Sequence, residues 1–209
     1  SPFKERVAIS GSHGKTTTTA MVTGILEAAG LDPTALVGGK LKGSQSGARV
    51  GLGDVFVAEA DESDRSFLKL HPTVSLVTNV DREHLDTYAD MAEVTEAFST
   101  FALGVPGPGR AVLCADDPIA AQIAERGRDR SLTYGFTAAA DVRGHCATGA
   151  DGFPTVQGAG SSGPFAFTLG VGGEMNALNA LGALAIAQIL GVAPALASES
   201  LAAFRGVAR

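Results

Sequence analysis

The stretch that decides the fold lies near the start of the chain and reads RVAISGSHGKTT over residues 6–17. Residues 6–10 form a short β-branched run, which favours a buried strand. Glycines at positions 11 and 14 interrupt it, and apolar residues then recur at helical spacing from Thr16 to about Ala29. A strand, a glycine turn and a helix in this order open an α/β unit.

The turn has the residue types that bind phosphate. Backbone N–H groups of a glycine turn at a helix N-terminus make an anion site, which the helix dipole strengthens. Lys15 supplies a positive charge for the β- and γ-phosphates of a nucleotide, and the Thr16 hydroxyl is placed to ligate Mg²⁺. The usual pattern has a further glycine where this chain has Ile9, so a tight turn with a surface lysine is the plain alternative. The predicted phosphate contacts are Gly11, Ser12, His13, Gly14, Lys15, Thr16 and Thr17.

The remaining pattern predicts an α/β domain over residues 1–209, with a mostly parallel sheet flanked by helices. A Gly-rich stretch with short alternating strands, residues 141–173, predicts a small antiparallel sheet attached to it. Further strands are expected over residues 54–58, 73–78 and 111–114, and helices over residues 91–103, 118–126, 176–190 and 195–204.

Composition excludes several classes of protein. The 209 residues and 21.1 kDa suit one ordinary domain, and 16 Lys and Arg against 22 Asp and Glu give a net charge of −6. An acidic chain lacks the basic face of a nucleic-acid binder. No apolar run reaches the roughly 18 residues of a membrane span. Two cysteines, Cys114 and Cys146, are too few for a disulfide framework, so a cytoplasmic domain is expected.

Two acidic segments follow predicted strands. Residues 59–64 read EADESD, and residues 79–86 read NVDREHLD. Ligands of open parallel sheets bind beyond the carboxyl ends of strands, and Mg²⁺ takes oxygen ligands. A solvated acidic loop and a helix cap with a surface His84 are the alternatives. The carboxylates of the first segment could face a cation, and His84 of the second could serve as a metal ligand or position a phosphate.

Five segments together resemble the Mur ligases, the ATP-dependent amide-forming enzymes of peptidoglycan synthesis. The matching segments are residues 11–19, 59–64, 79–88, 176–180 and 204–209. The resemblance implies that Lys15, Glu59 and His84 are catalytic, with Lys15 on the ATP phosphates. It also implies Thr16, Glu59 and His84 as ligands of Mg²⁺.

The late segment is similar to the part of the family that contacts adenine, which implies Asn176 and Asn179 as adenine contacts. Met175 stands where the family usually has histidine, and Gly47 stands where asparagine is common. Ser99 stands where several Mur ligases have a carbamoylated lysine, which favours the alanine-adding branch.

That branch implies a reaction and a domain plan. The γ-phosphate of ATP would activate the carboxylate of UDP-N-acetylmuramate, and L-alanine would attack the acyl phosphate to form an amide. The chain would be the central ATP-binding domain of three, expected to be inactive without the flanking UDP-sugar-binding and C-terminal domains.

Other hypotheses stay open. Folylpolyglutamate synthase shares the central fold, and a muropeptide-recycling ligase would use the same site. A GTPase-like switch needs an Asn-Lys-x-Asp segment, and residues 79–81 lack the lysine. A non-catalytic ATP-binding module is the remaining hypothesis.

Overall fold

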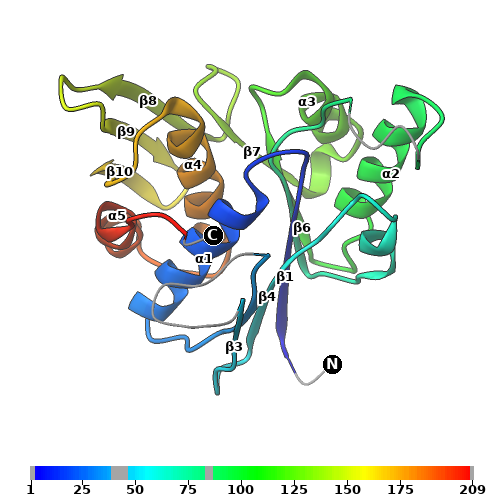
Figure 1. Cartoon of the computed structure of the whole chain (residues 1–209), viewed down its shortest axis with the longest axis horizontal. Coiled ribbons are helices and arrows are strands. Elements are labelled where there is room, and N and C mark those ends of the chain that lie inside the picture. The colour runs from blue at the N-terminus through cyan, green and yellow to red at the C-terminus, as the bar shows by residue number, and fades with distance from the viewer. Residues whose placement is uncertain (1–2, 39–46, 83–86, 208–209) are drawn as a thin grey trace.

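A computed structural model describes residues 3–38, 47–82 and 87–207. Within them, a mixed sheet lies between two groups of helices (Figure 1). The strands are β1 Glu5–Ser10, β2 Thr34–Leu36, β3 Ala48–Arg49, β4 Val55–Glu59, β5 Val74–Val77, β6 Arg110–Cys114, β7 Ser131–Gly135, β8 Val142–Thr148, β9 Pro154–Gly160 and β10 Gly163–Thr168. The α-helices are α1 Lys15–Ala28, α2 Met91–Leu103, α3 Pro118–Arg126, α4 Glu174–Ile189 and α5 Pro194–Ala203, and Ser66–Lys69 and Arg128–Arg130 are 3₁₀ turns.

The described strands form one ten-stranded sheet in the order β10-β9-β8-β7-β6-β5-β1-β4-β2-β3. All neighbouring pairs from β8 to β2 are parallel, as the α/β pattern predicted. Two short regions were not predicted as strands: β2 has three residues and β3 has two. At such lengths no alternation of apolar and polar residues can be recognised.

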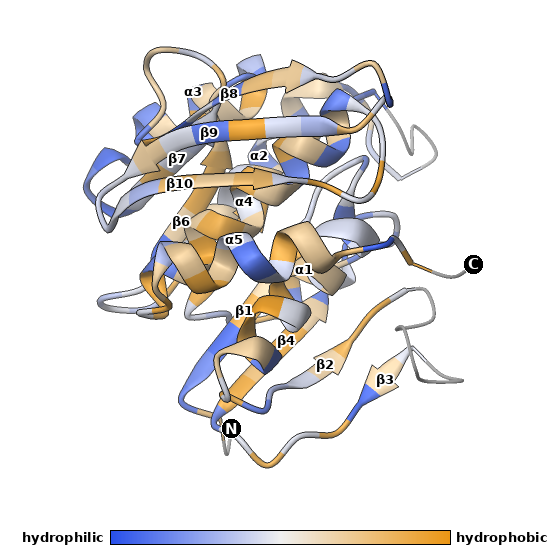
Figure 2. Cartoon of the chain, turned by 90° about the vertical axis from the view of Figure 1, so that its left-hand side faces the viewer, coloured by the Kyte–Doolittle hydropathy of each residue, from blue (hydrophilic) through white to orange (hydrophobic). Residues whose placement is uncertain are grey.

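The Gly-rich region contains the three antiparallel strands that its sequence predicted, β8 to β10. They do not form a separate sheet, because β8 pairs in parallel with β7 through Tyr134 opposite Val142. Figure 2 shows these strands lying over α4 and α5, and β10 is in contact with α5. The outermost strand carries Pro164, opposite Ala159 of β9.

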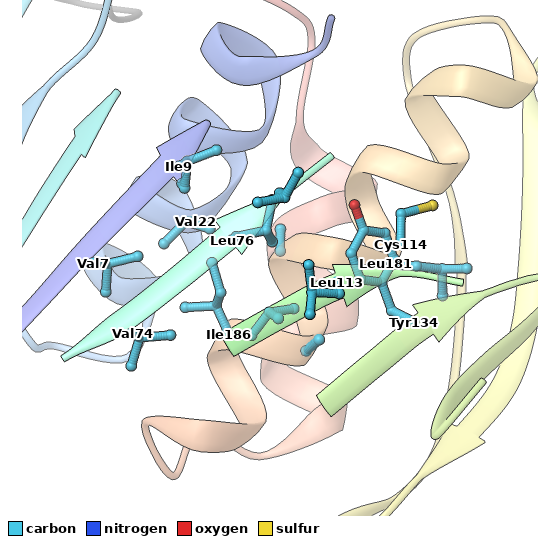
Figure 3. Close-up of a cluster of buried hydrophobic side chains, with 14 of the residues drawn as sticks. Val7, Ile9, Val22, Val74, Leu76, Leu113, Cys114, Tyr134, Leu181 and Ile186 are labelled. Carbon is cyan, nitrogen blue, oxygen red and sulfur yellow. The ribbon is translucent and has the colours of Figure 1, made fainter. Parts of the chain in front are cut away.

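The core lies between the parallel strands and the helices α1 and α4. Figure 3 shows Ile9 of β1, Leu76 of β5 and Leu113 of β6 pointing toward Val22 of α1 and Ile186 of α4. All five side chains are buried. Burying one such side chain stabilises the fold by about 1.5–3 kcal/mol, so this layer supplies much of the driving force for folding.

Cys114 and Tyr134 extend this layer, and both are buried. Burial raises the pKa of the Cys114 thiol to about 11 and that of Tyr134 well above its usual range. Gly182 of α4 lets the helix approach them, because a Cβ there would lie 2.9 Å from the Tyr134 ring. The absence of a side chain at this position therefore sets the spacing between helix and sheet.

Helices cover both faces of the sheet. Figure 1 shows α1, α4 and α5 on one side of the parallel strands and α2 and α3 on the other. Asp117 caps the start of α3, accepting hydrogen bonds from the N–H groups of Ile119 and Ala120. No helix in the described ranges has the length and apolar character needed to span a lipid bilayer.

Candidate functional site

The site lies at the carboxyl end of β1. This strand pairs with β4 on one side and β5 on the other, so the ends of all three strands are adjacent. The glycine loop follows β1, the segment 59–64 follows β4, and Asn79 follows β5. The topology therefore brings together the three polar segments predicted from the sequence, as far as residue 82 of the last one.

The glycine loop is shaped for close approach of a ligand to the backbone. Gly11 and Gly14 have φ angles of 137° and 86°, which L-residues with side chains rarely adopt. The first bond of α1 runs from the N–H of Thr18 to the carbonyl of Gly14 at 2.9 Å. The N–H groups of the three preceding helical residues have no partner four residues back. N–H groups of this kind can bind an anion, so the loop has the geometry that the predicted phosphate site requires, and the site itself stays a prediction.

Neighbouring strands hold the loop in place. The Asn79 side chain accepts a hydrogen bond from the His13 N–H at 2.8 Å and donates one to the His13 carbonyl at 3.0 Å. The Thr78 hydroxyl donates to the same carbonyl at 2.6 Å. The Asp81 N–H donates to the Ser12 hydroxyl at 2.8 Å. Sequence reasoning noted Asn79 only as part of a motif and missed this clamp, which depends on β1 and β5 being neighbours.

Lys15 points back into the loop rather than out to solvent. Its ammonium donates to the Gly11 carbonyl at 2.6 Å and to both carboxylate oxygens of Glu62 at 2.9 Å. The Glu62 side chain is 2 % exposed and the Lys15 side chain 15 %. The reading of Lys15 as a lysine on the surface of a tight turn is therefore wrong. Glu62 received no role from the sequence, because nothing local separates it from the other three carboxylates in residues 59–64.

Thr16 and Glu59, which are both predicted metal ligands, meet beside the loop. The Thr16 hydroxyl donates to the Glu59 carboxylate, 3.0 and 3.1 Å from its two oxygens, and the Gly38 N–H donates to the same group at 2.8 Å. Hydroxyl and carboxylate oxygens are donors that Mg²⁺ prefers, so these two residues fit the ion. Among the described residues no group of three His, Cys, Asp or Glu side chains could hold a metal. His84, the predicted third ligand, lies outside the described residues.

The two predicted adenine contacts occupy different environments. Asn179 is 5 % exposed and lies directly against the loop, because a Cβ on Gly14 would come within 2.4 Å of its side-chain oxygen. Asn176, one turn earlier on α4, is half-buried and donates to the Gly172 carbonyl at 2.7 Å. Met175 is 54 % exposed beside it. Asn179 therefore supports the back of the loop in this structure.

The structure also describes the two other residues that differ from the family pattern, Ser99 and Gly47. Ser99 lies buried in α2, and Gly47 lies next to β3 and lines a cavity of about 430 Å³ together with Glu59 and Asp61. The position expected to carry a carbamoylated lysine in related enzymes is thus a small buried side chain here.

A glycine loop with a lysine and a threonine at the start of a helix, placed at the end of an interior strand of a parallel sheet, defines a phosphate-loop α/β domain. Residues 9–187 match the sequence profile of the Mur ligase middle domain. The chain belongs to the Mur ligase family.

Relatives of known name support this assignment. The chain is 45 % identical over 210 residues to the UDP-N-acetylmuramate–L-alanine ligase of Burkholderia mallei, an alignment that covers 99 % of this chain and 45 % of the relative. A second relative of the same name, from Burkholderia thailandensis, is also 45 % identical with the same coverage. The chain therefore spans about half the length of the curated relatives it matches.

Solved structures agree. The UDP-N-acetylmuramate–alanine ligase of Thermotoga maritima superposes with a TM-score of 0.79 at 27 % identity, covering 98 % of this chain and 46 % of that one. The UDP-N-acetylmuramate:L-alanyl-gamma-D-glutamyl-meso-diaminopimelate ligase of Neisseria meningitides superposes with a TM-score of 0.82 at 26 % identity, covering 98 % of this chain and 67 % of that one. The mostly parallel sheet flanked by helices is thus the fold of known Mur ligases.

Proposed function

We propose that this chain is the ATP-binding middle domain of a ligase that joins L-alanine to UDP-N-acetylmuramate. The observation that carries the proposal is the placement of Lys15 and Thr16 at the start of α1, with Thr16 hydrogen-bonded to Glu59. The identity of 45 % to ligases of that name supports the choice of substrates. The remainder of such a ligase would supply the UDP-sugar-binding and C-terminal domains.

The chain's own residues have distinct parts in this proposal. The N–H groups at the start of α1 and the Lys15 ammonium bind the phosphates of ATP. Thr16 and Glu59 hold Mg²⁺, with His84 as a further ligand, and Asn176 and Asn179 lie on the adenine side. The bound ion supplies neutralisation of charge on the phosphates.

The proposed reaction transfers a phosphoryl group and then an acyl group. A carboxylate oxygen of the muramate attacks the γ-phosphorus of ATP, and the bond to the β-phosphate oxygen breaks to release ADP. The L-alanine amine then attacks the carbonyl carbon of the acyl phosphate. The tetrahedral intermediate loses inorganic phosphate and the amine loses a proton, leaving the amide. Lys15 stabilises the charge that develops on the transferred phosphoryl group.

Calorimetric titration with ATP and Mg²⁺ tests the phosphate loop on this chain directly. We expect saturable 1:1 binding that weakens about a hundredfold in Lys15→Ala, because the variant loses charge-assisted hydrogen bonds to phosphate. A Lys4→Ala variant removes a surface lysine, whose ammonium pairs with the exposed Asp54, and serves as the matched control. No binding, or equal binding by Lys15→Ala, would contradict the proposal.

Phosphate release in the presence of ATP, UDP-N-acetylmuramate and L-alanine tests the ligase activity in a longer chain that contains these residues. We expect turnover there and negligible turnover by the 209 residues alone. Turnover by the short chain would refute the proposed division into domains.

One second candidate has a specific observation behind it. The Neisseria structure, with a TM-score of 0.82, is named as a ligase of a tripeptide, L-alanyl-gamma-D-glutamyl-meso-diaminopimelate. Replacing L-alanine by this tripeptide in the same assay separates the two substrates. Turnover with the tripeptide but not with L-alanine would favour a recycling ligase.

A further inference from the structure

One carboxylate next to the phosphate loop differs from its neighbours in the segment 59–64. Asp61 and Asp64 are exposed, and Glu59 is half-buried beside Thr16. The Glu62 side chain is 2 % exposed, although it lies in a loop between β4 and a 3₁₀ turn. A carboxylate is rarely buried to this extent unless it is paired, so its partner identifies its role.

That partner is the lysine of the loop. Both Glu62 oxygens lie 2.9 Å from the Lys15 ammonium, and the Gly11 carbonyl lies 2.6 Å from it. An ammonium group has three N–H donors. Two of the three donors contact the Glu62 carboxylate, and one of them is enough to keep the ion pair. The other can therefore turn toward a bound anion.

The backbone that carries Glu62 is itself held in place. The buried Tyr88 hydroxyl donates to the Glu62 carbonyl at 2.7 Å, and the Thr87 hydroxyl donates to the Ser63 carbonyl at 2.7 Å. The Arg65 guanidinium lies over the Tyr88 ring, 4.7 Å from its centroid. These contacts attach the segment after the predicted metal histidine to the segment that carries Glu62.

We propose that Glu62 is a positioning residue, whose buried carboxylate holds the Lys15 ammonium inside the loop and keeps it there when a phosphate binds. Separating the pair would take the Lys15 ammonium away from a buried carboxylate, which is unfavourable. Without Glu62, the ammonium of a 15 %-exposed lysine has lost its counter-charge and turns outward to water. This inference rests on the proposed function, because it takes the loop to be an ATP site.

The test is titration of ATP with Mg²⁺ into the wild-type chain, Glu62→Gln, Lys15→Ala and the double variant. We expect Glu62→Gln to weaken ATP binding about tenfold, the size expected for a lost charge-assisted hydrogen bond. Because Glu62 acts through Lys15, the double variant should bind no more weakly than Lys15→Ala, which is a coupling that a purely structural role would not produce. Glu62→Asp keeps the charge and should fall between Glu62→Gln and the wild type.

Two controls keep the result interpretable. Asp64→Asn removes an exposed carboxylate of the same segment, which accepts a hydrogen bond from the nearby Ser66 N–H, and the variant should bind ATP like the wild type. Adenosine has no phosphate, so it should bind to Glu62→Gln and to the wild type with the same affinity. A distorted fold would instead weaken the binding of both ATP and adenosine. Thermal unfolding of each variant reports loss of folding separately.

Different outcomes overturn different statements. Absence of ATP binding by the wild type would refute the proposed function. A Glu62→Gln variant that binds ATP as tightly as the wild type, or more tightly, while Lys15→Ala binds weakly, would overturn the positioning role alone. The tighter result would identify Glu62 as a competitor of phosphate for Lys15.

Discussion

The edge of the sheet at the end of β1 and the layer of side chains behind it are built from different interactions. At the edge, a few hydrogen bonds and one buried ion pair hold the glycine loop, and each of the neutral bonds contributes about 0.5–1.5 kcal/mol. In the layer, Leu76, Leu113 and their neighbours are fully buried among apolar side chains (Figure 3). Substitutions at the edge should therefore change ligand binding more than stability, and substitutions in the layer the reverse.

Leu76→Ala should have the largest effect on stability. Leu76 is 0 % exposed in β5, and truncating such a residue leaves a cavity that lowers the free energy of unfolding by about 2–5 kcal/mol. Urea denaturation measures the loss, and the affinity for ATP below the transition should change less than twofold. Leu52→Ala, at a side chain 96 % exposed, should change the free energy of unfolding by less than about 0.5 kcal/mol. A large loss of ATP affinity in folded Leu76→Ala would show that the apolar layer also determines ligand binding at the edge.

Asn79→Ala should have the opposite effect, changing the affinity for ATP more than the stability of the fold. The variant loses both side-chain hydrogen bonds to the His13 backbone, at 2.8 and 3.0 Å. We expect ATP binding to weaken about tenfold and the free energy of unfolding to fall by only about 1–2 kcal/mol. Calorimetry and urea denaturation on the same preparation give both values. An unchanged affinity would mean that the loop keeps its shape without this clamp.

Asp117→Ala tests a residue that contacts the edge and also stabilises a helix outside it. Its carboxylate caps α3 and also accepts from the Val80 N–H at 3.3 Å, just beyond Asn79. Loss of the cap should lower the free energy of unfolding by about 1 kcal/mol, with a change in ATP affinity no larger than about twofold. Asp117→Asn keeps the acceptor oxygen and should restore most of the stability. If the alanine variant affects binding more than stability, the contact to Val80 is the more important one.

Protonation of Glu93 should have the smallest effect. The hydrogen bond from the Ala89 N–H, followed by that from Arg65, lowers the pKa of Glu93 below its ordinary value. A lowered pKa in the folded state means a stabilising contribution that is present above the pKa of the unfolded chain. It is lost as pH falls through the lower, folded-state value. Thermal unfolding of the wild type and Glu93→Gln between pH 7 and pH 3 should converge at the acid end, and a constant difference across this range would contradict the assignment.

The sequence predicted the parts of the site that depend on local order along the chain. Lys15 and Thr16 follow a glycine turn at a helix start, a pattern that fixes their placement before any tertiary contact is known. Glu62 could not be separated from its neighbours, because its burial depends on how the loop after β4 folds against Tyr88. The continuity of β8 with the main sheet was missed for a similar reason, since pairing of Tyr134 with Val142 leaves no local signal.

The two edge strands of the sheet affect whether one molecule can associate with another. An edge strand with many unpaired N–H and C=O groups is a template on which a strand of another chain can add. Here β3 offers two residues, and β10 carries Pro164, which has no N–H to donate. Both ends therefore present poor templates, and the buried parallel strands between them are protected from pairing with a strand of another molecule, even at high protein concentration.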